Sequence, residues 1–166
     1  MECGEDGDVM QGRAIEIRRD DPTASYVADL LAHHLAELQS VMGKHAQALD
    51  ASGLSDSAVT FWTVWQDDQL VGFGALKQLD DAHAEVKSMR AAPAARGTGV
   101  GRAILHHIIA EARKRGYARL SLETGTAPLH APAVSLYRSV GFTNCEPFAD
   151  YQASPHNQFM SFNLAD

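Results

Sequence analysis

Several features that mark other protein classes are scarce or missing in this 166-residue sequence. Its two cysteines cannot build a disulfide framework and favour a reducing, cytoplasmic location. No apolar run reaches the ~18 residues of a membrane-spanning helix, and no N-terminal stretch resembles a signal peptide. The net charge of −7 argues against a general nucleic-acid binder, because such proteins carry a basic excess. No Cys/His spacing suggests zinc. We therefore expect a cytoplasmic protein without membrane, nucleic-acid or metal partners.

The length predicts one domain, which we place at residues 13–166. Residues 1–12 precede it as an acidic tail that we expect to be disordered. Four of its first eight residues are acids, and no cation occurs before Arg13. No internal repeat or low-complexity tract divides the rest of the chain.

Hydrophobic periodicity predicts strands and helices along the whole domain. Residues 43–57 show neither pattern clearly, although a short helix over 46–49 fits them. Gly116 and Gly141 each follow a helical pattern, as glycines that end helices do. Strands are predicted at 14–18, 58–65, 70–76, 84–91, 118–123, 145–148 and 158–164, and helices over 23–42, 99–115 and 132–140. This order favours an α/β fold with one mixed sheet flanked by helices.

A glycine-rich segment, Arg96-Gly97-Thr98-Gly99-Val100-Gly101-Arg102, links the strand at 84–91 to the next helix. Glycine lets the backbone turn tightly and approach a ligand, and a helix N-terminus attracts anions. Eight of the fourteen lysines and arginines lie between Lys87 and Arg119, with Glu111 as the single acid among them. The segment lacks the Gly-Lys-Ser/Thr of a Walker loop and the third glycine of a dinucleotide fingerprint. We infer a local site for a polyanionic ligand.

Two segments resemble the GNAT N-acetyltransferase superfamily. Arg96-x-x-Gly99-x-Gly101 matches its Arg/Gln-x-x-Gly-x-Gly/Ala signature, and Ala133 to Phe142 is similar to its Ala-x-x-Leu-Tyr-x-x-x-Gly-Phe helix. The resemblance extends from Arg13 to the C-terminus and fits an uncharacterised bacterial small-molecule branch. It implies a mostly antiparallel sheet of about seven strands and acetyl-CoA as the co-substrate.

Acetylation of an amine requires removal of a proton, stabilisation of an oxyanion and protonation of a departing thiolate. Glu85 is the first candidate for the base, because the histone-acetylating branch has its glutamate at this offset from the signature. A strand carboxylate paired with Lys87 is the structural alternative, since residues two apart share a face. His83, Glu123 or a water chain are the other possible bases.

The resemblance assigns the remaining catalytic roles to Met89 and Tyr137. In the family, the strand before the glycine loop bulges and its backbone pairs with the pantetheine arm, so Met89 would offer its N–H to the oxyanion. Tyr137 matches the tyrosine that protonates the CoA sulfur, although a core aromatic residue would give the same pattern. The family often has Asn where this chain has His130. The cofactor-binding set that the resemblance implies is Met89, Ala91, Arg96, Gly97, Thr98, Gly99, Val100, Gly101, Arg102, His130 and Tyr137.

The sequence therefore predicts an enzyme that moves an acetyl group from acetyl-CoA to a primary amine of a small molecule, by direct attack in a ternary complex. A non-catalytic acyl-CoA-binding regulatory domain and a protein acetyltransferase are the alternatives. We expect a monomer or homodimer.

Overall fold

A computed structural model of the protein describes residues 14–42, 51–92, 95 and 97–164. The predicted tail 1–12, the helix suggested at 46–49 and the side chain of Arg96 lie outside the described residues.

One seven-stranded sheet runs through the described chain in the order β1-β2-β3-β4-β5-β7-β6. Every neighbouring pair is antiparallel except β4 with β5, which is parallel. The strands are β1 (Ile15–Arg19), β2 (Val59–Gln66), β3 (Gln69–Gln78), β4 (His83–Ala91), β5 (Arg119–Gly125), β6 (Thr143–Asn144) and β7 (Asn157–Asn163). The predicted fold class, a mixed and mostly antiparallel sheet flanked by helices, is confirmed.

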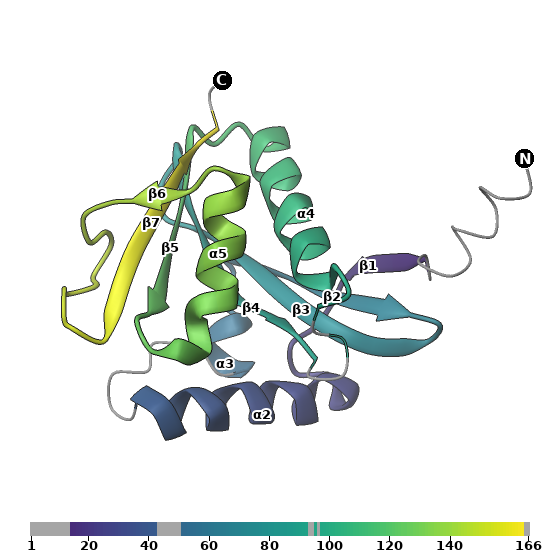
Figure 1. Ribbon diagram of the computed structural model, residues 1–166. Coiled ribbons are helices and arrows are strands. Elements are labelled where there is room, and N and C mark those ends of the chain that lie inside the picture. The colour runs from purple at the N-terminus through teal and green to yellow at the C-terminus, as the bar shows by residue number, and fades with distance from the viewer. Residues whose placement is uncertain (1–13, 43–50, 93–94, 96, 165–166) are drawn as a thin grey trace, which may run out of the picture.

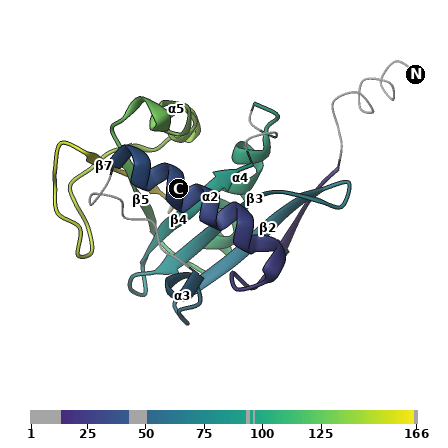
Figure 2. The same ribbon diagram turned by 90° about the horizontal axis from the view of Figure 1, so that it is seen from below.

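Helices cover both faces of the sheet (Figure 1). Helices α4 (Val100–Lys114) and α5 (Ala131–Val140) lie over one face, and the 3₁₀ turn η3 (Pro128–His130) leads into α5. Helix α2 (Ser25–Met42) and the short α3 (Ala51–Leu54) cover the other face, as the view from below shows (Figure 2). Each face has its own hydrophobic cluster.

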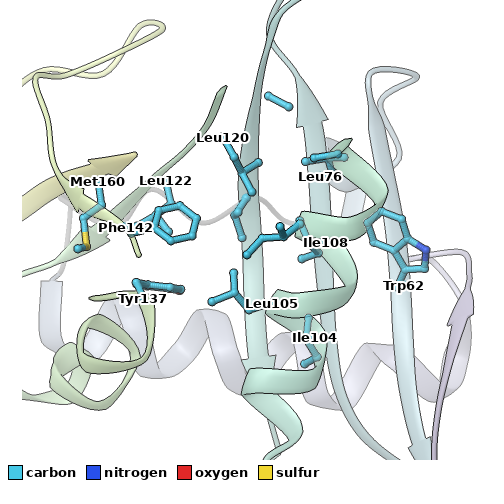
Figure 3. Packing of buried hydrophobic residues seen from close by; sticks show 14 of the residues in the cluster. Trp62, Leu76, Ile104, Leu105, Ile108, Leu120, Leu122, Tyr137, Phe142 and Met160 are labelled. Carbon is cyan, nitrogen blue, oxygen red and sulfur yellow. The ribbon is translucent and has the colours of Figure 1, made fainter. Parts of the chain in front are cut away.

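The larger cluster lies beneath α4 and α5 (Figure 3). Helix α4 buries the six residues that its periodicity predicts, which are Val100, Ile104, Leu105, Ile108, Ile109 and Ala112. Gly74 of β3 explains how closely the helix approaches the sheet, because a Cβ there would stand 2.6 Å from Ile104 Cγ2. Leu105 and Ile108 of α4 face Leu120 of β5 across this core (Figure 3).

Two local predictions were wrong. The helical period over 23–42 predicts Tyr26 on the buried face together with Leu31, but Tyr26 is 49% exposed, and Val27 fills the core position beside it. Residues 145–148 do not form a strand, because β6 has only Thr143–Asn144 and Pro147 cannot donate a ladder hydrogen bond. The segment 145–156 instead folds back over β7, where Phe148 lies 5.9 Å from Phe159, centroid to centroid.

Candidate active site

Strands β4 and β5 pair only at their beginnings. Their parallel register consists of His83 with Arg119, Ala84 with Leu120, and Glu85 with Ser121. Beyond Glu85 and Ser121 no pairing joins the two strands, although β4 continues to Ala91 and β5 to Gly125. The sheet therefore opens at its centre.

Strand β4 bulges where it leaves β5. Phe73 and Ala75 of β3 oppose Arg90 and Lys87, so two residues of β4 stand opposite the single Gly74. The first of these, Ser88, has a φ of 53°, a left-handed conformation that a serine adopts only under local constraint. The bulge expected from the family resemblance is thus present, and it re-aims the residue that follows it, Met89.

A cavity of about 730 Å³ occupies this opening. One end is formed by the glycine loop, including Gly97, Gly99 and Gly101. Two acidic side chains, Glu85 and Glu123, line it as well. Met89, Ala91, His130 and Tyr137 are also among its lining residues. The structure thus brings most of the predicted site residues to one cavity.

The glycine loop leads directly into α4. Gly99 precedes the helix with a φ of 90° and, as a glycine, has no side chain that could cap the first-turn N–H groups. Arg102 lies in that first turn. A cation there interacts unfavourably with the positive end of the helix dipole, and an anion bound beside it would offset this repulsion. Thr98 Oγ1 donates a hydrogen bond to the Ala95 carbonyl. The Val100 side chain is fully buried, so only the backbone of Val100 is left for a ligand to reach. The arrangement suits a phosphate-bearing ligand.

Tyr137 extends from α5 toward Leu105 and Phe142 (Figure 3). Its ring lies 5.9 Å from that of Phe142, centroid to centroid, and the side chain is 6% exposed. Burial raises the pKa of the phenol to about 12, so it stays protonated at neutral pH. Tyr137 thus belongs to the core and to the cavity wall at once, and the two predicted readings do not exclude each other.

Glu85 is held in a chain of polar contacts on the opposite face of the sheet. Tyr151 donates a hydrogen bond of 2.5 Å to Glu85 Oε2, and Lys87 Nζ donates one of 2.5 Å to the Tyr151 hydroxyl. Lys87 Nζ also lies 3.4 Å from Glu85 Oε2. Glu85 is 2% exposed and Lys87 is 8% exposed. The predicted pairing with Lys87 is present, but it is buried rather than on the surface.

Glu123 lies on β5 and has a freer carboxyl group. Its Oε2 is buried without a hydrogen-bond partner among the described residues. Burial raises the pKa of Glu123 to about 7; Asn157 and Lys87 oppose this rise, and Glu85 adds to it. A carboxyl group with this pKa can gain or lose a proton at neutral pH.

The histidines near the cavity are neutral. His130 lies in the wall, where burial lowers its pKa, and its Nε2 is buried with no hydrogen-bond partner in the described part of the chain. His34 of α2 also lines the cavity, and burial lowers its pKa to about 4. His83 shares a 2.6 Å hydrogen bond with Ser121 Oγ and contacts Phe148. His83 is not among the described residues that line the cavity.

Sequence reasoning missed the contribution of Lys87 and Tyr151 to one polar chain. Tyr151 lies in the segment between β6 and β7. It stands 66 positions after Glu85, and no motif surrounds it. The aromatic residues Phe148 and Phe159 on either side of it were the available signal, because they pack its ring at 5.2 and 5.8 Å.

Within the described residues, no group of three or more His, Cys, Asp or Glu side chains could hold a metal ion. Over that same part of the chain, no helix is long and apolar enough to cross a membrane.

The mixed sheet, the bulged strand β4 and the glycine loop that leads into α4 are the features that the family resemblance implies. The chain belongs to the acetyltransferase (GNAT) family, whose sequence model matches residues 18–142.

Its relatives agree with this assignment. An uncharacterised N-acetyltransferase of Escherichia coli K12, YedL, is 46% identical over 151 residues, covering 90% of this chain and 95% of that protein. YsnE of Bacillus subtilis 168, also an uncharacterised N-acetyltransferase, is 44% identical over 90% of this chain and all of its own. The crystal structure of an acyl-CoA N-acyltransferase from Klebsiella pneumoniae superposes with a TM-score of 0.75 at 27% identity, over 92% of this chain and 99% of that one.

Proposed function

We propose that this protein transfers the acetyl group of acetyl-CoA to a primary amine of a small molecule, by direct attack in a ternary complex. One observation carries the proposal. A single cavity joins the glycine loop at Gly97–Arg102 to Tyr137, Glu85 and Glu123, so thioester and amine can meet without a covalent enzyme intermediate. The buried position of Glu85 favours an acceptor small enough to enter the cavity.

The residues at the phosphate end fit acetyl-CoA. The N–H groups of the first turn of α4 and the Arg102 guanidinium suit the pyrophosphate. Arg102 Nη2 donates a 3.2 Å hydrogen bond to Ser139 Oγ, which ties the N-terminus of α4 to α5. In the proposal, Arg96 and Thr98 supply further phosphate contacts, and the backbone of Ala91 and the His130 side chain meet the pantetheine arm.

The reaction then uses groups on both strands and on α5. Acetyl-CoA supplies the thioester carbonyl. The Met89 N–H stabilises the oxyanion that develops on it. A wall carboxylate, Glu85 or Glu123, removes a proton from the acceptor ammonium. The amine nitrogen bonds to the carbonyl carbon, the carbon–sulfur bond breaks, and Tyr137 donates its proton to the sulfur. The tyrosinate recovers the second proton that nitrogen releases.

The proposal is tested by measuring CoA release from acetyl-CoA with benzylamine, cadaverine, ethanolamine and L-lysine, with mass spectrometry of each product. A gain of one acetyl group on an amine supports it. Tight acetyl-CoA binding by calorimetry with no acetylated product from these amines or from a wider metabolite extract would instead indicate a regulatory acyl-CoA-binding domain. Absence of acetyl-CoA binding would contradict both.

A further inference from the structure

We propose that Glu123 accepts the acceptor's proton, and that Glu85, Tyr151 and Lys87 form a fixed unit that positions the cavity wall beside it. This inference rests on the proposed acetyl transfer and divides its work between the two glutamates. We call Glu85, Tyr151 and Lys87 together the polar unit.

The contacts of Glu85 oppose its use as a base. Its Oε2 already accepts the Tyr151 hydroxyl and faces the Lys87 ammonium at 3.4 Å. A proton on Glu85 would cancel the carboxylate charge that pairs with the Lys87 ammonium, which is only 8% exposed. A buried charge that loses its partner is strongly destabilising. Each turnover would therefore have to break the pair and re-form it.

Glu123 Oε2 can accept a proton without displacing a hydrogen-bond donor among the described residues. The Asn157 side chain, as a hydrogen-bond partner, and the Lys87 charge favour the carboxylate, but burial outweighs both. Glu123 Oε2 is buried, lines the same cavity and has no hydrogen-bond partner among the described residues. Burial raises its pKa to about 7, so near neutral pH it is both ionised often enough to act and basic enough to take a proton. The ammonium gives one proton to this oxygen, an N–H bond breaks and an O–H bond forms. Solvent later removes that proton.

The polar unit sets the surroundings of Glu123. The charged and polar groups that act on Glu123 come from two neighbouring strands: Lys87 and Glu85 from β4, and Asn157 from β7. The Tyr151 hydroxyl, which carries its own raised pKa because of burial and Glu85, is the neutral donor of the unit. Lys87 and Glu85 have opposite effects on Glu123, so their pairing keeps the local charge balanced.

Tyr151 also attaches the segment 145–156 to the sheet. Its ring packs against Phe148 and Phe159, while its hydroxyl reaches β4. The polar unit is therefore a structural tie between that segment and β4. Both charged side chains of the unit are buried, Glu85 at 2% and Lys87 at 8% exposure.

The test compares E123Q with the double variant E85Q/K87M, with E146Q, an exposed glutamate near β6, as the matched control. The double variant removes both charges together, which avoids an unpaired Lys87. Rates are measured from pH 5.5 to 9 with acetyl-CoA and whichever of the four amines above reacts fastest. Wild type, E146Q and E85Q/K87M should each reach a plateau at high pH. The acetylation rate of E123Q should be at least 100-fold below that of wild type at pH 7. It should then rise about tenfold per pH unit, because only deprotonation by solvent supplies the free amine in this variant.

A second measurement needs no acceptor. In protein labelled with ¹³C at the glutamate carboxyl carbons, one glutamate should titrate near pH 7. That signal should vanish in E123Q and remain in E85Q/K87M and E146Q. Survival of the signal in E123Q, or a steadily rising pH–rate profile in E85Q/K87M with a plateau in E123Q, would overturn the assignment and return the role to Glu85. Acetyl-CoA binding by calorimetry is measured alongside; its absence in wild type would remove the proposed function while leaving the titration result readable.

Discussion

The imidazole of His130 lies directly over Gly125, so closely that a Cβ at Gly125 would stand 2.3 Å from His130 Cδ2. The contact joins the end of β5 to the turn η3, at the point where the cavity wall changes from strand to helix. It also explains why β5 ends in glycine.

Gly125→Ala should displace the His130 ring from the cavity wall. If His130 contacts the pantetheine arm, the Kd for acetyl-CoA should rise about as much as in His130→Ala. The double variant should then have a Kd no higher than that of either single variant. Calorimetry on the three proteins checks this. Additive losses would show that Gly125 and His130 act separately.

Gly101→Val should weaken acetyl-CoA binding at least tenfold while the protein stays folded. Its Cβ would lie 3.5 Å from Leu136 Cδ2, an ordinary contact, so the fold tolerates it. The branched side chain would nevertheless narrow the cavity beside the expected phosphates. Ala110→Val, on the exposed face of the same helix, is the control for helix propensity. Equal affinity in both variants would contradict the phosphate assignment.

Tyr137→Phe should lower kcat by about 100-fold, near the lower end of general acid contributions, because a phenol with a pKa of about 12 is a weak acid. Acetyl-CoA affinity should change little. Tyr117→Phe is the control, because it alters another buried tyrosine, which follows α4 in the sequence, and it should leave kcat unchanged. An unchanged kcat in Tyr137→Phe together with a lower melting temperature would make Tyr137 a core residue alone.

Glu123 should make the fold less stable as the pH rises. Its pKa goes from 4.5 in the unfolded chain to about 7 in the fold, so the folded state holds the proton more tightly. The resulting stabilisation is complete below pH 4.5 and is lost as the pH rises through 7. Glu123→Gln, which stays uncharged, should therefore be more stable than wild type at pH 8 by up to about 3 kcal/mol in urea unfolding. The difference should vanish near pH 4.5.

His34 should have the opposite effect on folding stability, which it should lower as the pH falls, over nearly the same pH range. Burial lowers its pKa from 6.5 to about 4, so the unfolded chain takes up a proton that the fold refuses. The stabilisation is present above pH 6.5 and is lost as the pH falls through 4. His34→Gln should remove up to about 3 kcal/mol of acid sensitivity across this window. If the variant lost stability with acid as steeply as wild type, His34 would have to take up its proton as readily in the fold as in the unfolded chain.

Patterns local in sequence predicted most of the fold. The six buried residues of α4 follow the helical period, and Gly116, with its φ of 86°, ends that helix as expected. The glycine loop and the Tyr137 helix were recognisable because each is one continuous motif. The prediction of β6 failed because its two residues carry no period at all.

What the sequence could not give was contact between distant residues. Glu85 was recognised by its offset from the signature, but its burial depends on Tyr151, which no spacing rule connects to it. The raised pKa of Glu123 arises from burial that only the folded sheet supplies. The polar contacts of Glu85 and Glu123 therefore had to come from the structure, whereas the glycine loop that we propose binds the phosphates was visible in the sequence.

The early end of pairing between β4 and β5 also bears on how long the protein survives in a cell. Only three residue pairs join the two halves of the sheet, and α4 and α5 lie over one of its faces. On the proposed function, acetyl-CoA would fill the seam, and a ligand at 100 times its Kd adds about 2.7 kcal/mol to the stability of the form that binds it. Protease resistance would then follow the supply of acetyl-CoA, and a starved cell would degrade this enzyme sooner than a well-fed one.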